Sequence, residues 1–359
     1  MRVLQLIDSL EVGGAERMAV NYANALSNEL TFSGLIATRK EGALLNQIGK
    51  DVSFLCLHKT QRIDLKAIFK LRKYIVDNKV DILHAHSSSF FIAVLVKLTL
   101  VKVKIIWHDH YGTRVEESLK ENKVLFLFSL FFSTIFVVNN QLKEWNERNL
   151  LCKKVIFIPN FTSDTREKKQ ITNLKGKEGK RIVILANLKK PKNHIIVIKA
   201  YFDLKLQDLD WSLHLIGKDY FDFYSKELKE FIKLNLLENH IHLYGERNDI
   251  DNILSQSSVG ILASTNEGFP VTLLEYARSR LAVISTNAGF CSEIIQNDFN
   301  GLLFDPQSDL ELKKQLQKII SNESFREKIS INFNVFVKEN YSKEIVIERL
   351  IMEYKKIRL

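Results

Sequence analysis

The chain has 359 residues, of which 46% are hydrophobic and 26% are charged, the proportions of a soluble globular protein. Its length is about twice that of a common domain and therefore predicts two domains. The cysteines, Cys56, Cys152 and Cys291, are odd in number and widely spaced, which argues against a disulfide framework and indicates a reducing cytoplasm.

The formal net charge is +10, and most of the surplus lies in one middle segment. Between Lys143 and Lys192 there are 14 lysines and arginines against 5 aspartates and glutamates. No nucleic-acid-binding motif accompanies this segment, so nucleic acid is not expected as a partner. An anionic membrane surface or a phosphorylated ligand fits the charge at least as well.

The first residues, MRVLQLIDSL, form a short apolar run with an early aspartate, which indicates a first strand and not a signal peptide. Gly13 and Gly14 follow, and they are expected to open a helix whose N-terminal amides favour an anion. The third glycine of a dinucleotide fingerprint is absent. A tight strand-to-helix turn without a ligand is the alternative reading of this pair.

Short β-branched runs alternate with helical patterns along the whole chain. In the first half, strands are expected at Val3–Ile7, Phe32–Ala37, Val52–Leu57, Ile82–His84, Lys104–Trp107, Ile135–Val138 and Val155–Ile158. In the second half, they are expected at Arg181–Ala186, Trp211–Ile216, His240–Leu243, Val259–Leu262, Ala282–Ser285 and Gly301–Phe304. This alternation predicts an α/β fold with two doubly wound parallel sheets, which bind ligands at the carboxyl ends of their strands.

Two apolar segments of the first half have a more specific interpretation. Leu65–Asp77 has helical spacing, with apolar residues at Leu65, Ile68, Phe69, Leu71, Ile75 and Val76. The run Val124–Val138 is too short to cross a bilayer, which needs about 20 residues. Its first part, up to Phe132, is expected to be a helix, either buried or lying on a membrane surface beside Lys120 and Lys123.

Two His-x-His pairs stand at strand ends, His84 with His86 and His108 with His110. Alternate residues of a strand share a face, so each pair is expected to point one way. Such pairs hold zinc in some hydrolases, but few carboxylate ligands lie nearby in the sequence. Structural histidines are the preferred interpretation of His84 and His86.

A polar, lysine-rich stretch at residues 163–180 predicts a linker. The expected domains are therefore residues 1–162 and 181–342, followed by a last helix at about Lys343–Ile357.

The most informative motif is NEGFPVTLLEYARS, which begins at Asn266. Pro270 fits a first helical position, and the next three N–H groups would then be unpaired and favour an anion. Glu275, one turn into the helix, can accept hydrogen bonds from ribose hydroxyls, and Glu267 can reach the same cavity from the preceding loop. The pattern predicts a nucleotide-sugar site, whereas an ordinary amphipathic helix with a solvated Glu275 is the alternative.

Glu267 and Glu275, embedded in EGFP-x-x-LLEYA, resemble the signature of retaining GT-B glycosyltransferases of family 4. The strings LHLIGKD, HLYGERND, STNAGFCSEII and NDFNGLLFD resemble the same family in wording and spacing. The resemblance implies two Rossmann-like domains that face each other across a cleft, with the last helix packing back on the first domain. It also implies a nucleoside-diphosphate sugar as the donor substrate, no further cofactor and no metal.

The resemblance further implies residue roles. His108, Glu267 and Lys192 take catalytic positions, and His108 is expected to touch the donor sugar. Donor binding is implied for Gly14, Asn187, Lys189, Lys192, Gly217, Gly268, Phe269, Pro270, Val271, Thr272, Leu273 and Glu275. The acceptor side is implied for Gly13, Asp109 and His110. Asn187 departs from the family, because an arginine usually stands there, and Lys189 is a candidate to supply the missing charge.

We therefore expect a cytoplasmic, retaining, metal-independent glycosyltransferase that acts on a glycan or lipid-linked acceptor in bacterial surface polysaccharide assembly. An anionic membrane surface is a further expected partner, and the sequence does not specify an oligomeric state. A nucleotide-sugar epimerase of GT-B shape, a zinc-dependent hydrolase that uses the His-x-His pairs, and a membrane-surface binding module without turnover are the alternatives.

Overall fold

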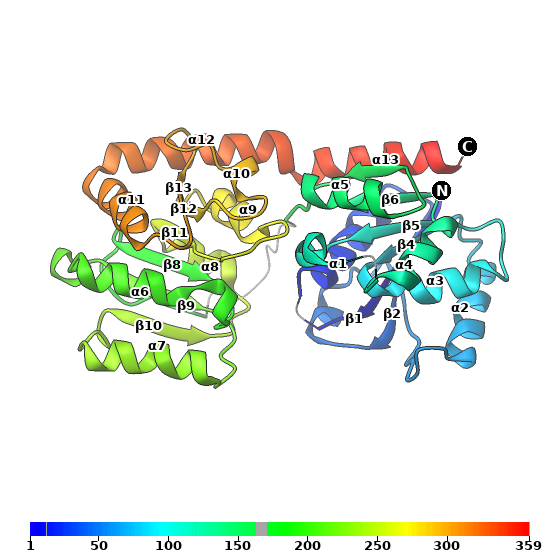
Figure 1. Ribbon diagram of the computed structural model, residues 1–359, viewed down its shortest axis with the longest axis horizontal. Coiled ribbons are helices and arrows are strands. Elements are labelled where there is room, and N and C mark those ends of the chain that lie inside the picture. The colour runs from blue at the N-terminus through cyan, green and yellow to red at the C-terminus, as the bar shows by residue number, and fades with distance from the viewer. Residues whose placement is uncertain (12, 119, 163–170, 359) are drawn as a thin grey trace. The chain divides into compact units, whose positions relative to one another are not determined.

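The computed structural model describes residues 1–11, 13–118, 120–162 and 171–358. The chain divides into two compact units, each built around its own parallel sheet (Figure 1). The first unit comprises Met1–Ser163 and Tyr341–Leu359, and the second comprises Asp164–Asn340. The predicted linker, 163–180, lies outside the described residues as far as residue 170.

The first unit contains a seven-stranded sheet in the order β3-β2-β1-β4-β5-β6-β7, and every pair is parallel. Its strands are β1 (Arg2–Ser9), β2 (Phe32–Lys40), β3 (Ser53–Cys56), β4 (Ile82–His86), β5 (Lys104–Asp109), β6 (Thr134–Val137) and β7 (Val155–Phe157). Most of their residues are buried, as expected of strands covered by helices on both faces. The winding direction reverses between β1 and β4, where the loops after the strands separate.

The helices of this unit are α1 (Gly14–Ser27), α2 (Leu65–Asp77), α3 (Phe90–Lys97), α4 (Lys123–Phe128) and α5 (Asn140–Asn149), with short 3-10 turns η1 (Ala43–Gln47), η2 (Ser87–Ser89), η3 (Gly112–Glu116) and η4 (Ser129–Phe131). Two of the helix starts are fixed by side-chain caps. The Asp64 carboxylate accepts from the Ala67 N–H, and the Asn139 side chain accepts from the Leu142 N–H.

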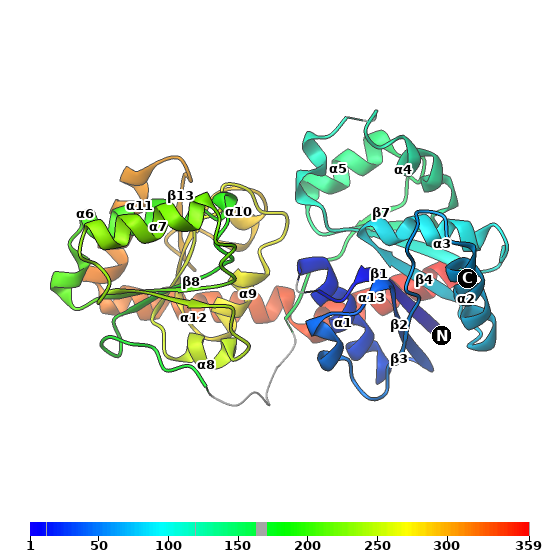
Figure 2. The same cartoon turned by 90° about the horizontal axis from the view of Figure 1, so that it is seen from below.

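The last helix, α13 (Lys343–Arg358), belongs to the first unit although the whole second unit precedes it in the sequence (Figures 1 and 2). Its buried residues include Leu350 and Tyr354, which share one core cluster with Val3, Met18 and Ile82. The Tyr354 hydroxyl also lies 2.6 Å from Nδ1 of His84 on β4. The two ends of the chain therefore close the same hydrophobic core.

The second unit contains a six-stranded parallel sheet in the order β10-β9-β8-β11-β12-β13. Its strands are β8 (Arg181–Leu185), β9 (Ser212–Ile216), β10 (Ile241–Gly245), β11 (Val259–Leu262), β12 (Ala282–Thr286) and β13 (Leu302–Phe304). Its helices are η5 (Lys190–Lys192), α6 (His194–Asp203), η6 (Leu206–Leu209), α7 (Phe223–Leu234), α8 (Ile250–Ser255), α9 (Val271–Arg278), α10 (Cys291–Ile294), α11 (Asp309–Ser321) and α12 (Glu323–Tyr341). Here the winding reverses between β8 and β11.

The predicted α/β class is confirmed, and each predicted strand is present with ends shifted by a few residues. Not every apolar residue of the predicted apolar segments is buried. On α2, Ile68, Leu71 and Ile75 are buried, whereas Leu65 and Phe69 are each 64% exposed. Among the described residues, no helix combines the length and the apolar character that crossing a membrane requires.

We expect Leu350→Ala, in α13, to destabilise the first unit by about 2–5 kcal/mol, because the fully buried side chain leaves a cavity in the core. Urea unfolding measures this in a Trp211→Phe background, in which Trp107 and Trp145 report on the first unit alone. Met352→Ala is the control, since Met352 is 52% exposed on the same helix. Equal stability of the two variants would show that α13 does not complete this core.

Candidate functional site

Two predicted site residues meet at the carboxyl edge of the second sheet. Lys192 ends η5 in the loop after β8, and Glu267 lies in the loop after β11. Their side chains form an ion pair, with Nζ 2.6 Å from Oε1, and are 32% and 11% exposed. Because β8 and β11 are the strands between which the winding reverses, this pair occupies the position where doubly wound sheets bind ligands.

The loops after β8, β11 and β12 are tied together around this ion pair. The Thr265 N–H donates to the Pro191 carbonyl at 2.9 Å, and the Phe269 ring stacks on Phe290 with 5.3 Å between centroids. Gly289 has φ of +59°, and a Cβ there would lie 1.8 Å from the Glu267 carbonyl oxygen. Only glycine fits this position, so Gly289 supports Glu267. The sequence motif STNAGF contained this signal, but the glycine was not predicted as a site residue.

The start of α9 differs from the prediction. Pro270 is the residue before the helix, not its first helical position. The N–H groups of Val271 and Leu273 donate to the carbonyls of Phe269 and Pro270, both at 3.0 Å. These two amides are therefore engaged in the turn, because the chain tightens here before the α-helical pattern begins, and the expected run of unpaired amides is wrong for them.

Glu275 lies in the body of α9 and is buried. Leu273, Leu274 and Ala277 are fully buried and hold one face of the helix in the core, whereas Glu275 is 8% exposed. The Tyr276 hydroxyl accepts from the Leu185 N–H on β8 at 2.9 Å. The helix is thus anchored to the strand that precedes Lys192.

Asn187 joins the loops after β8 and β9. Its Oδ1 accepts from the Lys218 N–H at 2.9 Å, and the neighbouring Leu188 N–H donates to the Lys218 carbonyl. Gly217 follows β9 with its N–H bonded to Gly245, and a Cβ on it would lie 2.1 Å from the Ala186 carbonyl oxygen. Asn187 therefore joins these two loops through its side chain, and its contact with a donor stays a prediction.

Two lysines share one aromatic ring beside these loops. The Nζ atoms of Lys189 and Lys218 lie 4.9 and 5.3 Å from the centroid of Tyr220. Lys218 and Tyr220 were not predicted as site residues, because a lysine and a tyrosine in a polar loop carry no sequence signal. The ring brings two positive charges to the carboxyl edge of β8 and β9.

The remaining donor-side residues, Gly268 and Thr272, belong to the same segment. Gly268 lies in the loop between Glu267 and α9, and the Thr272 hydroxyl is 3.5 Å from the Leu185 carbonyl oxygen. Within the second unit, the predicted residues from Asn187 to Glu275 lie on the loops after β8, β9 and β11 and on helix α9, at one edge of the sheet.

In the first unit, the four histidines of the two pairs form one stack. Because β4 and β5 are neighbours and His86 is in register with His108, the rings of adjacent pairs overlap, with centroids 4.1 to 5.5 Å apart. His84 Nε2 lies 3.1 Å from His108 Nδ1, and His86 Nδ1 lies 2.9 Å from His110 Nε2. His86 Nε2 also lies 2.8 Å from the Gln5 side-chain oxygen. The structural interpretation of His84 and His86 fits these contacts.

Burial sets the charge of the stack. It lowers the pKa of His84, His86 and His108 well below the usual range, and neighbouring imidazoles lower these values further. Burial also lowers the pKa of His110 to about 3. The imidazoles are therefore neutral at neutral pH. His108 is 0% exposed and its Nε2 has no hydrogen-bond partner, whereas His110 is partly exposed.

The nitrogen atoms of the stack lie close together. One nitrogen each of His84, His86 and His108 lies within 4.8 Å of the others. The rings are nearly parallel, with interplanar angles of 10° to 26°, and imidazole lone pairs lie in the ring plane. Both nitrogens of His84, both of His86 and Nδ1 of His108 already lie within hydrogen-bond distance of another group, so these contacts do not favour the zinc-hydrolase alternative.

Asp109 belongs to the scaffold of the first unit. Its carboxylate is 0% exposed and accepts from Arg114 Nε at 2.7 Å and from the Tyr111 N–H at 3.2 Å. Burial raises its pKa, and the Arg114 guanidinium opposes this rise. These contacts hold the loop after β5, and a contact of Asp109 with the acceptor stays a prediction.

The glycine pair opens α1 as predicted. Gly13 is the residue before the helix, and Gly14 is its first residue. A Cβ added to Gly14 would meet nothing within 4 Å. The surrounding structure leaves room for a side chain there, and the role of Gly14 beside a ligand stays a prediction.

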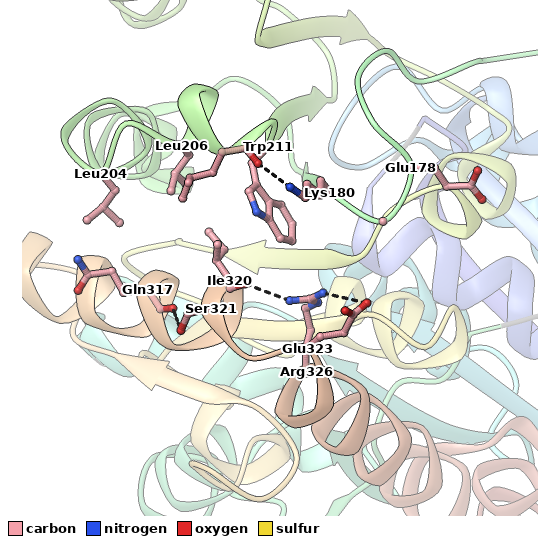
Figure 3. Close-up of a pocket in the computed structure, with 12 residues that line it drawn as sticks. Glu178, Lys180, Leu204, Leu206, Trp211, Gln317, Ile320, Ser321, Glu323 and Arg326 are labelled. Carbon is pink, nitrogen blue, oxygen red and sulfur yellow. Dashed lines mark hydrogen bonds and ion pairs between the residues drawn. The ribbon is translucent and has the colours of Figure 1, made fainter.

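A cavity of about 780 Å³ lies at the opposite end of the second sheet (Figure 3). Lys180 and Trp211, which precede β8 and β9, line it together with Leu206 and Arg326. The Arg326 guanidinium donates to the Ile319 and Ile320 carbonyls at the end of α11 and lies 5.4 Å from the Trp211 ring. Arg326, which lines the cavity, is thus engaged in contacts that hold the fold together, and no predicted site residue lines the cavity.

The histidine stack predicts acid destabilisation. The pKa values are lower in the folded state than the unfolded value of about 6.5, so the unfolded chain binds more protons below that pH. The contribution of these neutral histidines to the free energy of unfolding is fully present above about pH 6.5 and is lost as the pH falls. Each histidine contributes a slope of about 1.4 kcal/mol per pH unit. Urea unfolding between pH 7.5 and 5 measures this slope. His110→Asn should reduce the slope by the contribution of one histidine, about 1.4 kcal/mol per pH unit. An unchanged slope in this variant would contradict the assignment.

Comparisons with known proteins agree with this fold and identify the family. The family described as "Glycosyltransferase Family 4" matches residues 12–166, and "Glycosyl transferases group 1" matches residues 164–334. The chain is 25% identical over 377 residues to the UDP-Gal:alpha-D-GlcNAc-diphosphoundecaprenol alpha-1,3-galactosyltransferase of Escherichia coli, with 95% of each chain covered.

A second relative is the GalNAc-alpha-(1->4)-GalNAc-alpha-(1->3)-diNAcBac-PP-undecaprenol alpha-1,4-N-acetyl-D-galactosaminyltransferase of Campylobacter jejuni, 24% identical over 347 residues with 92% of each chain covered. Among solved structures, Anabaena Alr3699/HepE in complex with UDP and glucose superposes with a TM-score of 0.82 at 16% identity, covering 99% of this chain and 100% of that one. These matches do not favour the epimerase or hydrolase alternatives. The chain therefore belongs to the family 4, group 1 glycosyltransferases and has their GT-B fold of two Rossmann-like domains.

Proposed function

We propose that the protein transfers a sugar from a uridine-diphosphate sugar to a hydroxyl of a lipid-linked glycan, with retention of the anomeric configuration and without a metal ion. The observation that carries the proposal is the Lys192–Glu267 ion pair at the reversal point of the second sheet, with the buried Glu275 eight residues further on. The names of the relatives, which include a UDP-sugar donor and undecaprenol-linked acceptors, support the substrate classes.

The donor is held by groups of opposite character. Glu275 accepts hydrogen bonds from the ribose hydroxyls, and Lys192 binds the diphosphate. Lys189 supplies the second cation in place of the family's arginine, with its ammonium held over Tyr220. An ammonium beside phosphate stabilises the negative charge that builds up as the leaving group departs, so this charge arrangement needs no metal.

The chemistry proceeds on one face of the donor sugar. The bond between the anomeric carbon and the diphosphate oxygen breaks, and an oxocarbenium-like transition state forms. The acceptor oxygen bonds to the same carbon on the same face, and its proton passes to the departing phosphate. Glu267 lies against Lys192 and is placed to orient the sugar while Lys192 stabilises the phosphate.

In the first unit, we assign sugar contact to the histidine stack and close approach to Gly13 and Gly14. His110, the partly exposed member, makes the contact, and the buried His108 orients it from behind through the stack. Both rings are neutral, so they act as hydrogen-bond partners and not as acids. This assignment moves the contact from His108, as predicted from the sequence, to His110.

The acceptor chemistry places the reaction at a membrane. A polyprenyl-linked glycan stays in the bilayer, so the enzyme must reach it from the membrane surface. We therefore propose a peripheral location on the inner face of the cytoplasmic membrane and a role in surface polysaccharide assembly.

Glu275→Ala should weaken UDP binding by about 1.5–3 kcal/mol for each hydroxyl bond lost, because a charged acceptor is removed. Glu267→Gln should instead leave UDP binding nearly unchanged and lower turnover. Calorimetry with UDP and steady-state kinetics separate the two effects. Glu293→Gln, an exposed glutamate on α10, is the matched control. Unchanged UDP affinity in Glu275→Ala would contradict its assignment to the nucleotide.

The reaction itself tests retention and metal independence. With an α-linked UDP-sugar and a synthetic short-chain polyprenyl-diphosphate glycan, the product should carry an α-linkage by proton NMR. The rate should be the same in EDTA, because Lys192 and Lys189 neutralise the diphosphate. A β-linked product, or loss of activity in EDTA that a divalent cation restores, would overturn the corresponding half of the proposal.

A further inference from the structure

A buried glutamine is linked to the histidine stack through both ends of its amide. Gln5 lies in the middle of β1, is 0% exposed, and is in register with His84 on β4. Its side-chain oxygen lies 2.8 Å from His86 Nε2, and its side-chain nitrogen lies 3.5 Å from the Tyr354 hydroxyl. Two chains of hydrogen bonds therefore begin at one amide, and we call them the oxygen chain and the nitrogen chain.

The oxygen chain runs from Gln5 through His86 to His110. An amide oxygen only accepts hydrogen bonds, so His86 carries its proton on Nε2. The neutral ring of His86 then accepts at Nδ1, and the donor is the Nε2–H of His110, 2.9 Å away. The single ring proton of His110 is therefore on Nε2. Its Nδ1 keeps a lone pair and has no hydrogen-bond partner among the described residues.

The nitrogen chain runs from Gln5 through Tyr354 and His84 to His108. The Gln5 side-chain N–H donates to the Tyr354 hydroxyl oxygen, and this hydroxyl lies 2.6 Å from His84 Nδ1. Burial raises the pKa of Tyr354, so the phenol keeps its proton and donates it to His84 Nδ1. His84 then donates from Nε2 to His108 Nδ1 at 3.1 Å, and the proton of His108 lies on Nε2. All four imidazoles thus carry their proton on Nε2.

The opposite set of tautomers conflicts with the contacts at both ends of the amide. With its proton on Nδ1, His86 would place a lone pair against the Gln5 oxygen. With its proton on Nδ1, His84 would leave the Tyr354 proton facing the Gln5 N–H. The cost of the observed set falls on His108, whose buried Nε2 has no hydrogen-bond partner among the described residues. The orientation of one amide therefore decides where the protons of the stack lie.

We propose that Gln5 is a positioning residue for the transfer reaction, which fixes the protons of the stack so that Nδ1 of His110 accepts a hydrogen bond from a hydroxyl of the donor sugar. This inference rests on the proposed function, in which His110 contacts the sugar. A fixed acceptor determines the direction in which that hydroxyl points its proton, and so it holds the sugar in one orientation. Gln5 acts through His86 and touches no substrate itself.

Nitrogen NMR of the full-length protein locates these protons directly. The nine histidines are labelled with ¹⁵N in the ring, and long-range proton–nitrogen correlation distinguishes protonated from unprotonated ring nitrogens. Single His→Asn variants assign the signals. In the wild type, each member of the stack should be protonated on Nε2 at neutral pH. A proton on Nδ1 of His110 would overturn the proposal, because the amide of Gln5 would then be turned the other way.

Gln5→Met keeps the length of the side chain and removes its acceptor oxygen. His86 and His110 should then shift towards protonation on Nδ1, because a buried N–H without a partner costs more than a lone pair without one. Urea unfolding of the first unit shows that the variant is folded. Unchanged tautomers of His86 and His110 in this variant would contradict the role of Gln5.

Two tyrosine variants are matched controls. Tyr354→Phe removes the hydroxyl of the nitrogen chain, so it should release the protons of that chain and leave those of the oxygen chain in place. Tyr22→Phe removes the same atom from a second ring that is 0% exposed and lies 5.7 to 6.0 Å from three rings of the stack. The Tyr22 hydroxyl lies 3.4 Å from the Pro159 carbonyl oxygen, so all four protons should stay unchanged. Shifted tautomers in Tyr22→Phe would show that any disturbance of this core moves the protons, and would overturn the proposal.

Kinetics connect the protons to sugar transfer. Gln5→Met should lower kcat about threefold to tenfold, the effect of one neutral hydrogen bond, and leave UDP affinity unchanged because UDP carries no sugar. Monodeoxy UDP-sugars sharpen this test. One of them should lose the hydroxyl that His110 holds, so the wild type should transfer it slowly and Gln5→Met should slow it no further. Equal slowing of every monodeoxy donor by Gln5→Met would indicate a general structural effect instead.

The NMR measurement uses the free protein, so this inference and the proposed function can fail separately. Wild-type transfer, together with unchanged tautomers and unchanged kcat in Gln5→Met, would overturn the role of Gln5 and leave the proposed function intact. The expected protons without transfer to a polyprenyl-linked acceptor would contradict the proposed function and the sugar contact of His110. Gln5 would in that case still be shown to set the protons of the stack.

Discussion

In each sheet of this protein, the chain winds outward in one direction, returns to the first strand and then winds in the other direction. Two loops that leave neighbouring strands at this reversal must diverge, because the helices that follow them cover opposite faces of the sheet. In the second unit these loops hold Lys192 and Glu267, and in the first unit the reversal lies beside the glycine pair and the histidine stack. The placement of the site thus follows from the topology, and side chains only adjust it.

Contacts that involve the backbone, more than side-chain charge, set the final positions of these loops in the second unit. Thr265 ties one loop to the other, Gly289 lets a third loop lie against the Glu267 carbonyl, and Asn187 joins the loops after β8 and β9. These contacts fix where the Lys192 ammonium can lie before any ligand arrives. An arrangement that is already in place needs less reorganisation when charge develops in the reaction.

Local periodicity predicted the strands well, because β-branched runs between turn residues are a local signal. It did not predict which apolar residues are buried. On α2, Ile68 and Leu71 face the core while Leu65 and Phe69 face outward. All four residues are apolar, so the sequence pattern alone does not separate the buried from the exposed ones. The His-x-His spacing predicted two pairs that each share a face, but their union into one stack required the register of β4 with β5. The engagement of Asp109 by Arg114, and of the Val271 amide by the turn before α9, likewise depends on geometry that spacing does not carry.

The position of α13 has a consequence for how the chain is made. Its residues Leu350 and Tyr354 complete the core that also holds Val3 and Met18. During synthesis the first sheet leaves the ribosome early, yet this side of it stays uncovered until α13 has been made. The second unit, whose residues are continuous in the sequence, can fold without waiting for a later segment. The N-terminal unit is therefore the last to be completed, and its open apolar surface is what a chaperone would recognise on the nascent chain.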